Sequence, residues 1–152
     1  MIWNDEQYMQ IALGLAEEAF KRGEVPIGAV LVRDGEIISQ NHNRREELQD
    51  ATAHAEILVL REAGGLLGSW RLLGTTLYVT LEPCPMCAGA LVQARVSRLV
   101  FGTRDPKGGA AVSLYNIPAD PRLNHRLEVE EGILSERCAA LLQKFFKERR
   151  EK

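Results

Sequence analysis

The chain of 152 residues is 45 % hydrophobic and 26 % charged, which indicates one soluble globular domain spanning residues 1–152. Its formal net charge of −2 excludes a protein that binds nucleic acid through overall positive charge. No run approaches the roughly 20 apolar residues of a membrane span, and the polar, acidic residues 1–10 do not resemble a signal peptide. Three cysteines argue against a disulfide framework. We therefore expect a cytoplasmic protein without membrane contact.

The first predicted elements are a helix and a hairpin. Residues 4–21 carry apolar side chains at helical spacing, and Asn4 with Gln7 three positions later is typical of a capping box. Two apolar runs, 28–32 and 36–39, flank an Asp-Gly pair, which is the strongest short signal for a hairpin. We expect the helix to serve packing rather than chemistry.

A loop and a second helix are predicted next. Residues 40–52 are polar and without periodicity, which is typical of a loop. Thr52 is a suitable N-cap for the helix that follows, and Gly64-Gly65 is a suitable end for it. Because the run 57–60 is apolar all round, we expect this helix to be buried on several sides.

The second half of the chain predicts a strand, a helix and a further strand. The β-branched run 76–81 is followed by a helix that starts near Pro85 and ends near Arg95, and then by an apolar strand at 98–102. A strand, a helix and a strand in this order form a right-handed crossover between two parallel strands.

The remaining residues predict a long loop, an edge strand and a terminal helix. Residues 103–124 hold glycine, proline and charge, with a short helix expected around 113–117, and a loop of this length is usually functional. An edge strand is expected at 127–129. The terminal amphipathic helix carries apolar residues at helical spacing: Leu134, Cys138, Leu141, Leu142 and Phe145. The predicted fold is an α/β/α sandwich of three layers with a mixed central sheet.

The chemistry is expected around the segment Pro-Cys-Pro-Met-Cys at 83–87. Cys84 and Cys87 are three positions apart, so a helix turns both sulfurs toward one point. Pro85 fits the first position of that helix, and the helix N-terminus favours the thiolate form of Cys84. These two cysteines are therefore candidate metal ligands.

His54 and Glu56 complete the candidate metal site. On a regular helix, residues that are two positions apart point about 200° away from each other. The side chains of His54 and Glu56 can therefore approach one metal ion only if it lies beyond the helix end, near the helix axis. Three ligands, His54, Cys84 and Cys87, leave one coordination position open, which is typical of catalytic rather than structural zinc. We expect one Zn²⁺ per chain, with Glu56 as the catalytic proton shuttle rather than a ligand.

The combination of His-x-Glu with a later Pro-Cys-x-x-Cys is the signature of zinc-dependent nucleobase deaminases. The chain closely resembles bacterial tRNA-specific adenosine deaminases in segments spread over nearly its whole length: Glu24-Val25-Pro26, Asn43-Arg44, Thr80–Ala90, Val100-Phe101-Gly102, Asp105–Gly109 and Phe145–Arg150. This resemblance implies a cytidine-deaminase-like fold. It also implies hydrolytic deamination of adenosine to inosine at the wobble position of a tRNA anticodon.

The resemblance further implies partners and binding residues. In the resembled family the enzyme is a homodimer and acts on the anticodon stem-loop of a tRNA. Asn43 is then expected to bind the flipped-out nucleotide. Contacts with the anticodon loop are carried over more loosely to five positions: Asp105, Lys107, Asn124, Phe146 and Arg150.

The basic tail of the chain has two interpretations. Its cations outnumber Glu148 and Glu151: Lys144, Lys147, Arg149, Arg150 and Lys152. They suit the C-terminal dipole of a solvated helix, or they contact RNA phosphates. Phe145 and Phe146 fit either the core or stacking on bases. Charge alone favours the solvated helix, and the resemblance favours RNA.

Two alternatives to a tRNA deaminase remain open. A deaminase of free guanine or cytosine shares the zinc motifs but has no use for the basic tail. A non-catalytic, zinc-stabilised RNA-binding module requires a fourth protein ligand, and His42 and His125 are assigned no metal role. Cys138 is expected to be a small buried residue. Val112 departs from the small glycine that the family often has, which bears on the shape of the loop after Lys107.

Overall fold

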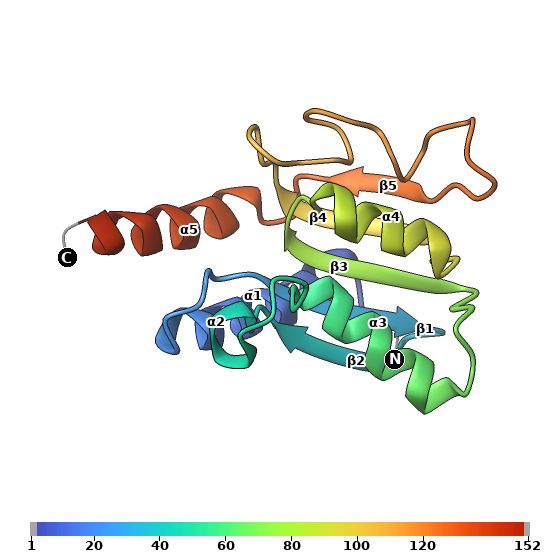
Figure 1. Cartoon of the computed structure of the whole chain (residues 1–152), viewed down its shortest axis with the longest axis horizontal. Coiled ribbons are helices and arrows are strands. Elements are labelled where there is room, and N and C mark those ends of the chain that lie inside the picture. The colour runs from blue at the N-terminus through green and yellow to red at the C-terminus, as the bar shows by residue number, and fades with distance from the viewer. Residues whose placement is uncertain (1–2, 151–152) are drawn as a thin grey trace.

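The computed structural model describes residues 3–150, so Glu151 and Lys152 of the basic tail lie outside the described residues. A sheet of five strands forms the centre, in the order β2-β1-β3-β4-β5 (Figure 1). The strands are β1 (Gly28–Arg33), β2 (Glu36–His42), β3 (Thr75–Leu81), β4 (Arg98–Thr103) and β5 (Glu128–Glu131). β1 is antiparallel to β2 and β3, whereas β3, β4 and β5 are parallel, which confirms the predicted mixed sheet and its parallel pair.

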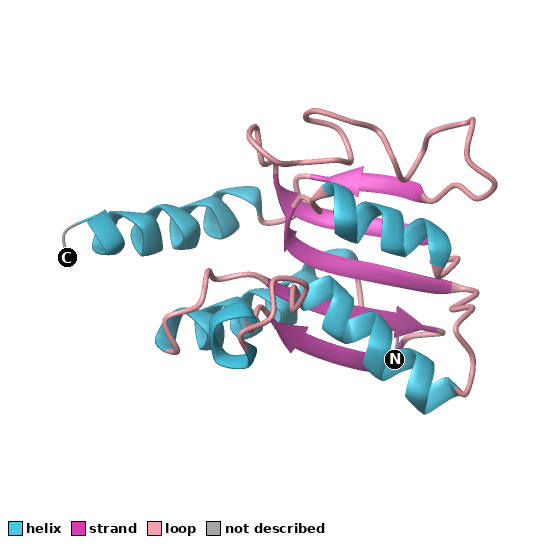
Figure 2. Cartoon of the chain, in the orientation of Figure 1, coloured by secondary structure: helices cyan, strands magenta, loops and turns pink. Residues whose placement is uncertain are grey.

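Helices cover both faces of the sheet and give the predicted three layers (Figure 2). The helices are α1 (Asp5–Lys21), α2 (Arg45–Leu48), α3 (Ala55–Leu67), α4 (Pro85–Gln93) and α5 (Ser135–Arg150). α3 and α4 pack on one face, and α1 and α5 pack on the other. Within residues 3–150, no helix combines the length and the apolar character that crossing a membrane requires.

Each face of the sheet has its own hydrophobic core because strand side chains alternate between the two faces. Leu77 and Val79 of β3 belong to the core under α3 and α4. Tyr78 lies between them in sequence and belongs, with Val100, to the core under α1 and α5. Phe101 is fully buried, and burying such a side chain stabilises the fold by about 1.5–3 kcal/mol.

The start of α1 is fixed by the predicted capping box and by an ion pair. Asn4 Oδ1 accepts the Gln7 N–H at 2.9 Å, and Gln7 Oε1 accepts the Asn4 N–H at 2.8 Å. The two carboxylate oxygens of Asp5 accept hydrogen bonds from the Arg98 guanidinium at 2.8 and 2.7 Å, and the Tyr78 hydroxyl donates to Asp5 at 2.7 Å. These contacts tie α1 to the two central parallel strands.

The predicted boundaries of α3 are wrong at both ends. His54 is the N-cap rather than Thr52, because the N–H and hydroxyl of Thr52 donate to Asp50 Oδ1 at 2.8 and 2.7 Å. The helix continues past the glycines at 64–65 and ends before Gly68, which adopts a φ of 63°. A glycine inside a helix costs about 1 kcal/mol without ending it, and the residue before Gly68 packs against the core.

The predicted loop at 40–52 is partly wrong. β2 extends to His42, which pairs with Gly28. The short helix α2 follows, and the N–H groups of its second and third residues donate to the buried carboxylate of Glu24 at 3.0 and 2.7 Å. Because Glu24 is more than 20 positions away, local periodicity could not predict this helix.

The long connection between β4 and β5 lacks the short helix predicted at 113–117. Residues 110–113 form a turn, because N–H groups in this stretch donate to the Glu82 carboxylate rather than to helical carbonyls. β5 begins one residue later than the edge strand predicted at 127–129, and it lies at the edge of the sheet as predicted. The terminal helix is confirmed, and Cys138 is buried within it.

Candidate active site

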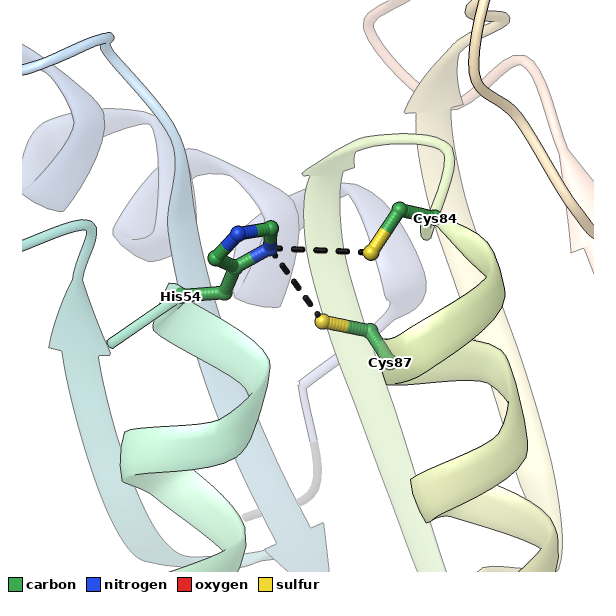
Figure 3. A group of neighbouring side chains, drawn as sticks. All are labelled: His54, Cys84 and Cys87. Atoms are coloured by element: carbon green, nitrogen blue, oxygen red, sulfur yellow. Dashed lines mark hydrogen bonds between the residues drawn. The ribbon is translucent and has the colours of Figure 1, made fainter. Parts of the chain in front are cut away.

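Two helix N-termini meet beside the end of β3. A short turn leads from Leu81 to Cys84, which is the N-cap of α4, and His54 is the N-cap of α3. Neither side chain hydrogen-bonds to its own helix, so both are free to face the space between the helices. Pro85 lies in the first turn of α4, where its missing N–H costs no helical hydrogen bond. Figure 3 shows His54, Cys84 and Cys87 pointing toward one another from these helix starts.

The spacing of these three side chains fits a zinc ion. His54 Nδ1 lies 3.6 Å from Cys84 Sγ and 3.5 Å from Cys87 Sγ, and all three donor atoms lie within 4.8 Å of one another. A tetrahedral zinc ion with bonds of about 2.0–2.1 Å to nitrogen and about 2.3 Å to sulfur separates those donors by about 3.6 Å. Among the described residues, no fourth histidine, cysteine or carboxylate belongs to this cluster.

The protons of the cluster are shared among its members. The hydrogen bond from Cys87, and then the one from His54, lower the pKa of Cys84 to about 4. The pKa of Cys87 is raised, because its proton is held by Cys84 and because the thiol is buried. The hydrogen bond to Cys84 raises the pKa of His54, against the effect of burial. Cys84 is therefore a thiolate at neutral pH, which is the form that binds a metal cation.

Glu56 lies beside the cluster and is 4 % exposed. His54 precedes the helix in an extended conformation, so the separation of about 200° between two helical positions does not apply to this pair. Burial raises the pKa of Glu56 to about 7. A carboxyl group with this pKa can both accept and donate a proton near neutral pH.

A cavity of about 260 Å³ opens beside the cluster. It brings together six of the predicted site residues: Asn43, His54, Glu56, Cys84, Asp105 and Phe146. Cys87 is fully buried next to it. Val25, Ile27 and Leu81 form apolar walls, and apolar walls with a few convergent polar groups are typical of a site for a small organic group.

Asn43 is held rigidly at the wall of this cavity. It is 2 % exposed, its Nδ2 donates to the Val25 carbonyl at 3.2 Å, and its Oδ1 accepts the Arg45 N–H at 3.1 Å. A carboxamide has two N–H donors and two acceptor lone pairs. One donor and one lone pair are therefore left for a ligand in the cavity.

A basic hollow adjoins the cavity and shares Asp105 and Phe146 with it. Four cations line it: Arg104, Lys107, Arg149 and Arg150. Phe145 is buried against Phe20, whereas Phe146 is 44 % exposed at the hollow. The two interpretations of the aromatic pair thus both apply, because one ring packs in the core and the other is available for stacking. Lys147, on the same helix, does not line the hollow.

The cations that line the basic hollow differ in whether another group of the protein already binds them. Arg149 donates to the Gly23 carbonyl and lies 4.9 Å from the centre of the Phe145 ring. Arg104 forms an ion pair with Glu131 at 2.7 Å. Within residues 3–150, neither Lys107 nor Arg150 is paired with a carboxylate. These two cations are therefore the most available for an anionic ligand.

Asn124 is not brought to the cavity or to the basic hollow. The Nε2 atom of the neighbouring His125 lies 2.7 Å from the carbonyl oxygen of Val96, just before the start of β4. Asp105 and the cavity lie beyond the other end of that strand. Contact between Asn124 and RNA stays a prediction. His42 is buried, with Nδ1 2.8 Å from the carbonyl oxygen of Asn43.

Sequence analysis missed Glu82, a buried carboxylate that also lines the cavity. Burial favours its neutral acid, but hydrogen bonds from Ser113 and from backbone N–H groups outweigh burial and lower the pKa of Glu82. The sequence signal that could have indicated this residue was its position, since a carboxylate there stands directly between an apolar strand and the Pro-Cys motif. Val112 is 37 % exposed and contributes its N–H to this carboxylate, so a larger side chain at this position is accommodated at the surface.

Comparisons with known proteins agree with this geometry. A family model described as MafB19-like deaminase matches residues 3–150. A tRNA-specific adenosine deaminase from Bacillus subtilis (strain 168) is 56 % identical over 148 residues, covering 97 % of this chain and 92 % of the relative. A solved structure from a study of A-to-I editing by tRNA:A34 deaminases at the wobble position of transfer RNA has a TM-score of 0.86 at 49 % identity, covering 89 % of this chain and 98 % of that one. The guanine deaminase from Bacillus subtilis has a TM-score of 0.64 at 38 % identity, covering 67 % of this chain and 66 % of that one.

Proposed function

Since this chain belongs to the MafB19-like deaminases and, within them, to the tRNA-specific adenosine deaminases, we propose that it converts adenosine to inosine at the wobble position of a tRNA anticodon. The reaction is hydrolytic: water adds at C6 of adenine and ammonia leaves. The observation that carries the proposal is the position of Glu56 beside a His-Cys-Cys cluster, at the wall of a cavity that adjoins a basic hollow.

His54, Cys84 and Cys87 hold one zinc ion per chain in this proposal. Their donor separations of 3.5 and 3.6 Å fit a tetrahedral site. When bound, zinc supplies a Lewis acid that lowers the pKa of a water molecule. These three residues would hold the ion and would not by themselves close a four-coordinate site.

Glu56 moves the protons of the reaction. Its pKa of about 7 makes the carboxylate and the acid comparably populated near neutral pH. It accepts a proton from the attacking water and delivers it to N1 of adenine. It then takes the remaining proton from the hydroxyl group at C6 and passes it to the amine, which leaves as ammonia while C6 becomes a carbonyl. One buried carboxyl group thus acts first as a base and later as an acid.

Recognition of the tRNA is divided between the cavity and the basic hollow. The target base is taken out of the stack and enters the cavity, where the spare donor and lone pair of Asn43 bind it. Asp105 and Phe146 lie at the boundary of the two spaces and contact the nucleotide and its neighbours. Lys107 and Arg150 bind phosphates of the anticodon loop, and Asn124 is a further contact.

The resemblance alone supports two further parts of the proposal. The enzyme acts as a homodimer, and it works in the cytoplasm, where bacterial tRNA is found. Sedimentation of the purified protein at several concentrations tests the dimer, because a monomer at every concentration contradicts it.

A free-base guanine deaminase is the second candidate, favoured by the structural likeness to the guanine deaminase of Bacillus subtilis. It accounts for the cavity and the metal cluster but gives no role to the basic hollow. The deciding assay measures inosine in tRNA transcripts that carry adenosine at the wobble position, beside ammonia release from free guanine and free cytosine. We expect inosine in the transcripts and no ammonia from the free bases. Binding of tRNA without inosine formation by the zinc-loaded protein would instead support the non-catalytic module.

A further inference from the structure

Glu82 takes no part in the proposed reaction, yet it connects the metal-ligand segment to the loop that borders the cavity. It follows β3 directly, lies two positions before Cys84, and donates its own N–H to the Thr103 carbonyl at 2.9 Å. Its side chain is 2 % exposed. A charged group enclosed to this degree is stable only where hydrogen-bond donors surround it.

All the donors to this carboxylate come from one loop, residues 105–113. Glu82 Oε1 accepts the Asp105 N–H at 3.0 Å and the Ser113 hydroxyl. Oε2 accepts three successive N–H groups at 3.0, 2.8 and 2.9 Å: those of Ala111, Val112 and Ser113. The carboxylate thus holds both ends of the loop: Oε1 binds its first residue and the Ser113 hydroxyl, and Oε2 binds the three N–H groups at its end.

The backbone of the 105–113 loop packs directly against the Glu82 carboxylate. A Cβ added to Gly109 would lie 2.3 Å from the carboxyl carbon of Glu82, so a larger residue here would push the loop and the carboxylate apart. The Ala110 N–H donates to the Pro83 carbonyl at 2.8 Å, one residue before the first cysteine ligand. The loop is therefore attached to the metal-ligand segment through two adjacent residues.

Asp105 is the residue that this attachment places. Its N–H is bound to Glu82, and its Oδ1 accepts the N–H groups of Lys107 and Gly108 at 3.1 and 3.2 Å. Asp105 borders both the cavity and the basic hollow, and Lys107 lines the hollow. A shift of the Asp105 backbone therefore moves both side chains relative to the metal cluster.

We propose that Glu82 is a positioning residue whose carboxylate fixes Asp105 and the 105–113 loop against the metal-ligand segment, so that the target nucleotide is held in a productive position. The inference rests on the proposed tRNA deamination and adds a residue that acts through Asp105 and the 105–113 loop. It assigns to the Glu82 carboxylate a role that neither zinc binding nor proton transfer supplies.

The Glu82→Gln variant tests this role selectively. The glutamine oxygen can keep the three N–H groups on the Oε2 side, and its NH₂ group then faces the Asp105 N–H, which has no acceptor left. We expect full zinc content, a raised KM for an anticodon stem-loop and a lowered kcat, with kcat/KM reduced by about 10²-fold, as for a small misplacement of reacting groups. In NMR hydrogen exchange, the Asp105 amide should exchange faster while those of residues 111–113 stay protected.

Two further variants separate positioning from loss of stability. Val100→Ala opens a cavity in the core under α1 and α5, on the far face of the sheet, and should lower the melting temperature without changing KM or Asp105 exchange. Gly109→Ala keeps the carboxylate but forces the loop away from it. It should reproduce the raised KM of Glu82→Gln, and it serves as the test if Glu82→Gln does not fold.

Wild-type kcat/KM in folded Glu82→Gln would overturn the inference, as would equal kinetic changes in Val100→Ala. Loss of zinc from Glu82→Gln would also overturn it, because Glu82 would then act through the metal. Failure of the proposed function would give a different result, because the wild-type protein itself would then produce no inosine in the stem-loop. Unchanged Asp105 exchange in Glu82→Gln would still refute the anchoring in that case.

Discussion

The cavity has two walls, and a buried carboxyl group in each of them shows how the walls differ. Glu56 of α3 and Glu82 of the β3–α4 turn are 4 % and 2 % exposed. Burial raises the pKa of Glu56 to about 7, whereas the hydrogen bonds around Glu82 outweigh burial and lower its pKa. The two pKa values thus shift in opposite directions, and the carboxyl group whose pKa is lowered is the one that accepts several hydrogen bonds.

The same contrast extends to the residues around each carboxyl group. The wall with Glu56 contains the metal cluster, whose members come from two short motifs at two helix starts. The wall with Glu82 includes the 105–113 loop, whose N–H groups donate to the Glu82 carboxylate and whose residues Asp105 and Lys107 line the basic hollow. The first wall is suited to chemistry and the second to recognition.

Cys87→Ala should have the largest effect, because it removes one of the three proposed metal ligands and, with it, the proposed tie between the two helix starts. We expect zinc measured by atomic absorption to fall far below one ion per chain, with loss of inosine formation and a lower melting temperature. Cys138→Ala is the matched control, since Cys138 is also buried but lies on α5. Full zinc retention by Cys87→Ala would exclude Cys87 as a ligand.

Glu56→Ala should separate chemistry from binding. All three ligands remain, so zinc content and tRNA affinity should persist while the rate of deamination falls by at least about 10²- to 10⁴-fold, the usual contribution of general acid–base catalysis. Glu62→Ala, at an exposed position of the same helix, is the control and should retain the wild-type rate. Near-normal inosine formation by Glu56→Ala is incompatible with a proton shuttle at this position.

Glu82→Ala should affect stability more than Glu56→Ala does. Removal of the Glu82 carboxylate leaves several enclosed N–H groups without an acceptor, and each such group costs about 1–3 kcal/mol unless water replaces the carboxylate. We expect a loss of at least about 2 kcal/mol in urea unfolding of the zinc-loaded protein. Removal of the Glu56 carboxyl group does not leave a comparable set of N–H groups without an acceptor. Equal free energies of unfolding for the two variants would break the contrast between the two walls.

Arg150→Gln should have the smallest effect, on the salt dependence of tRNA binding. Each lost phosphate contact reduces the slope of log K against log salt by about 0.7–0.9. Lys147→Gln is the matched control, because Lys147 lies on the same exposed helix end but outside the basic hollow. The slope should fall only for Arg150→Gln, and equal slopes for both variants would place the phosphate contacts elsewhere.

The candidate metal ligands could be predicted from the sequence, because the two cysteines are brought together by local spacing. Cys84 and Cys87 lie three positions apart at a helix start marked by Pro85, so one helical turn brings their sulfurs together. His54 and Glu56 were predicted from their motif, and His54, expected within a regular helix, instead precedes the helix in an extended conformation. The mixed sheet also followed from the order of strands and helices.

Only the tertiary structure decided how the recognition wall is held. Glu82 contacts residues 23–31 positions away, and Glu24 caps α2 from 22 positions away, so periodicity within a short window carried no sign of either contact. The same holds for the basic tail, where the packing of α5 places Arg150 at the hollow and leaves Lys147 outside it. Local spacing fixes which atoms meet within one helical turn, whereas the donors that surround a buried charge depend on how distant segments pack.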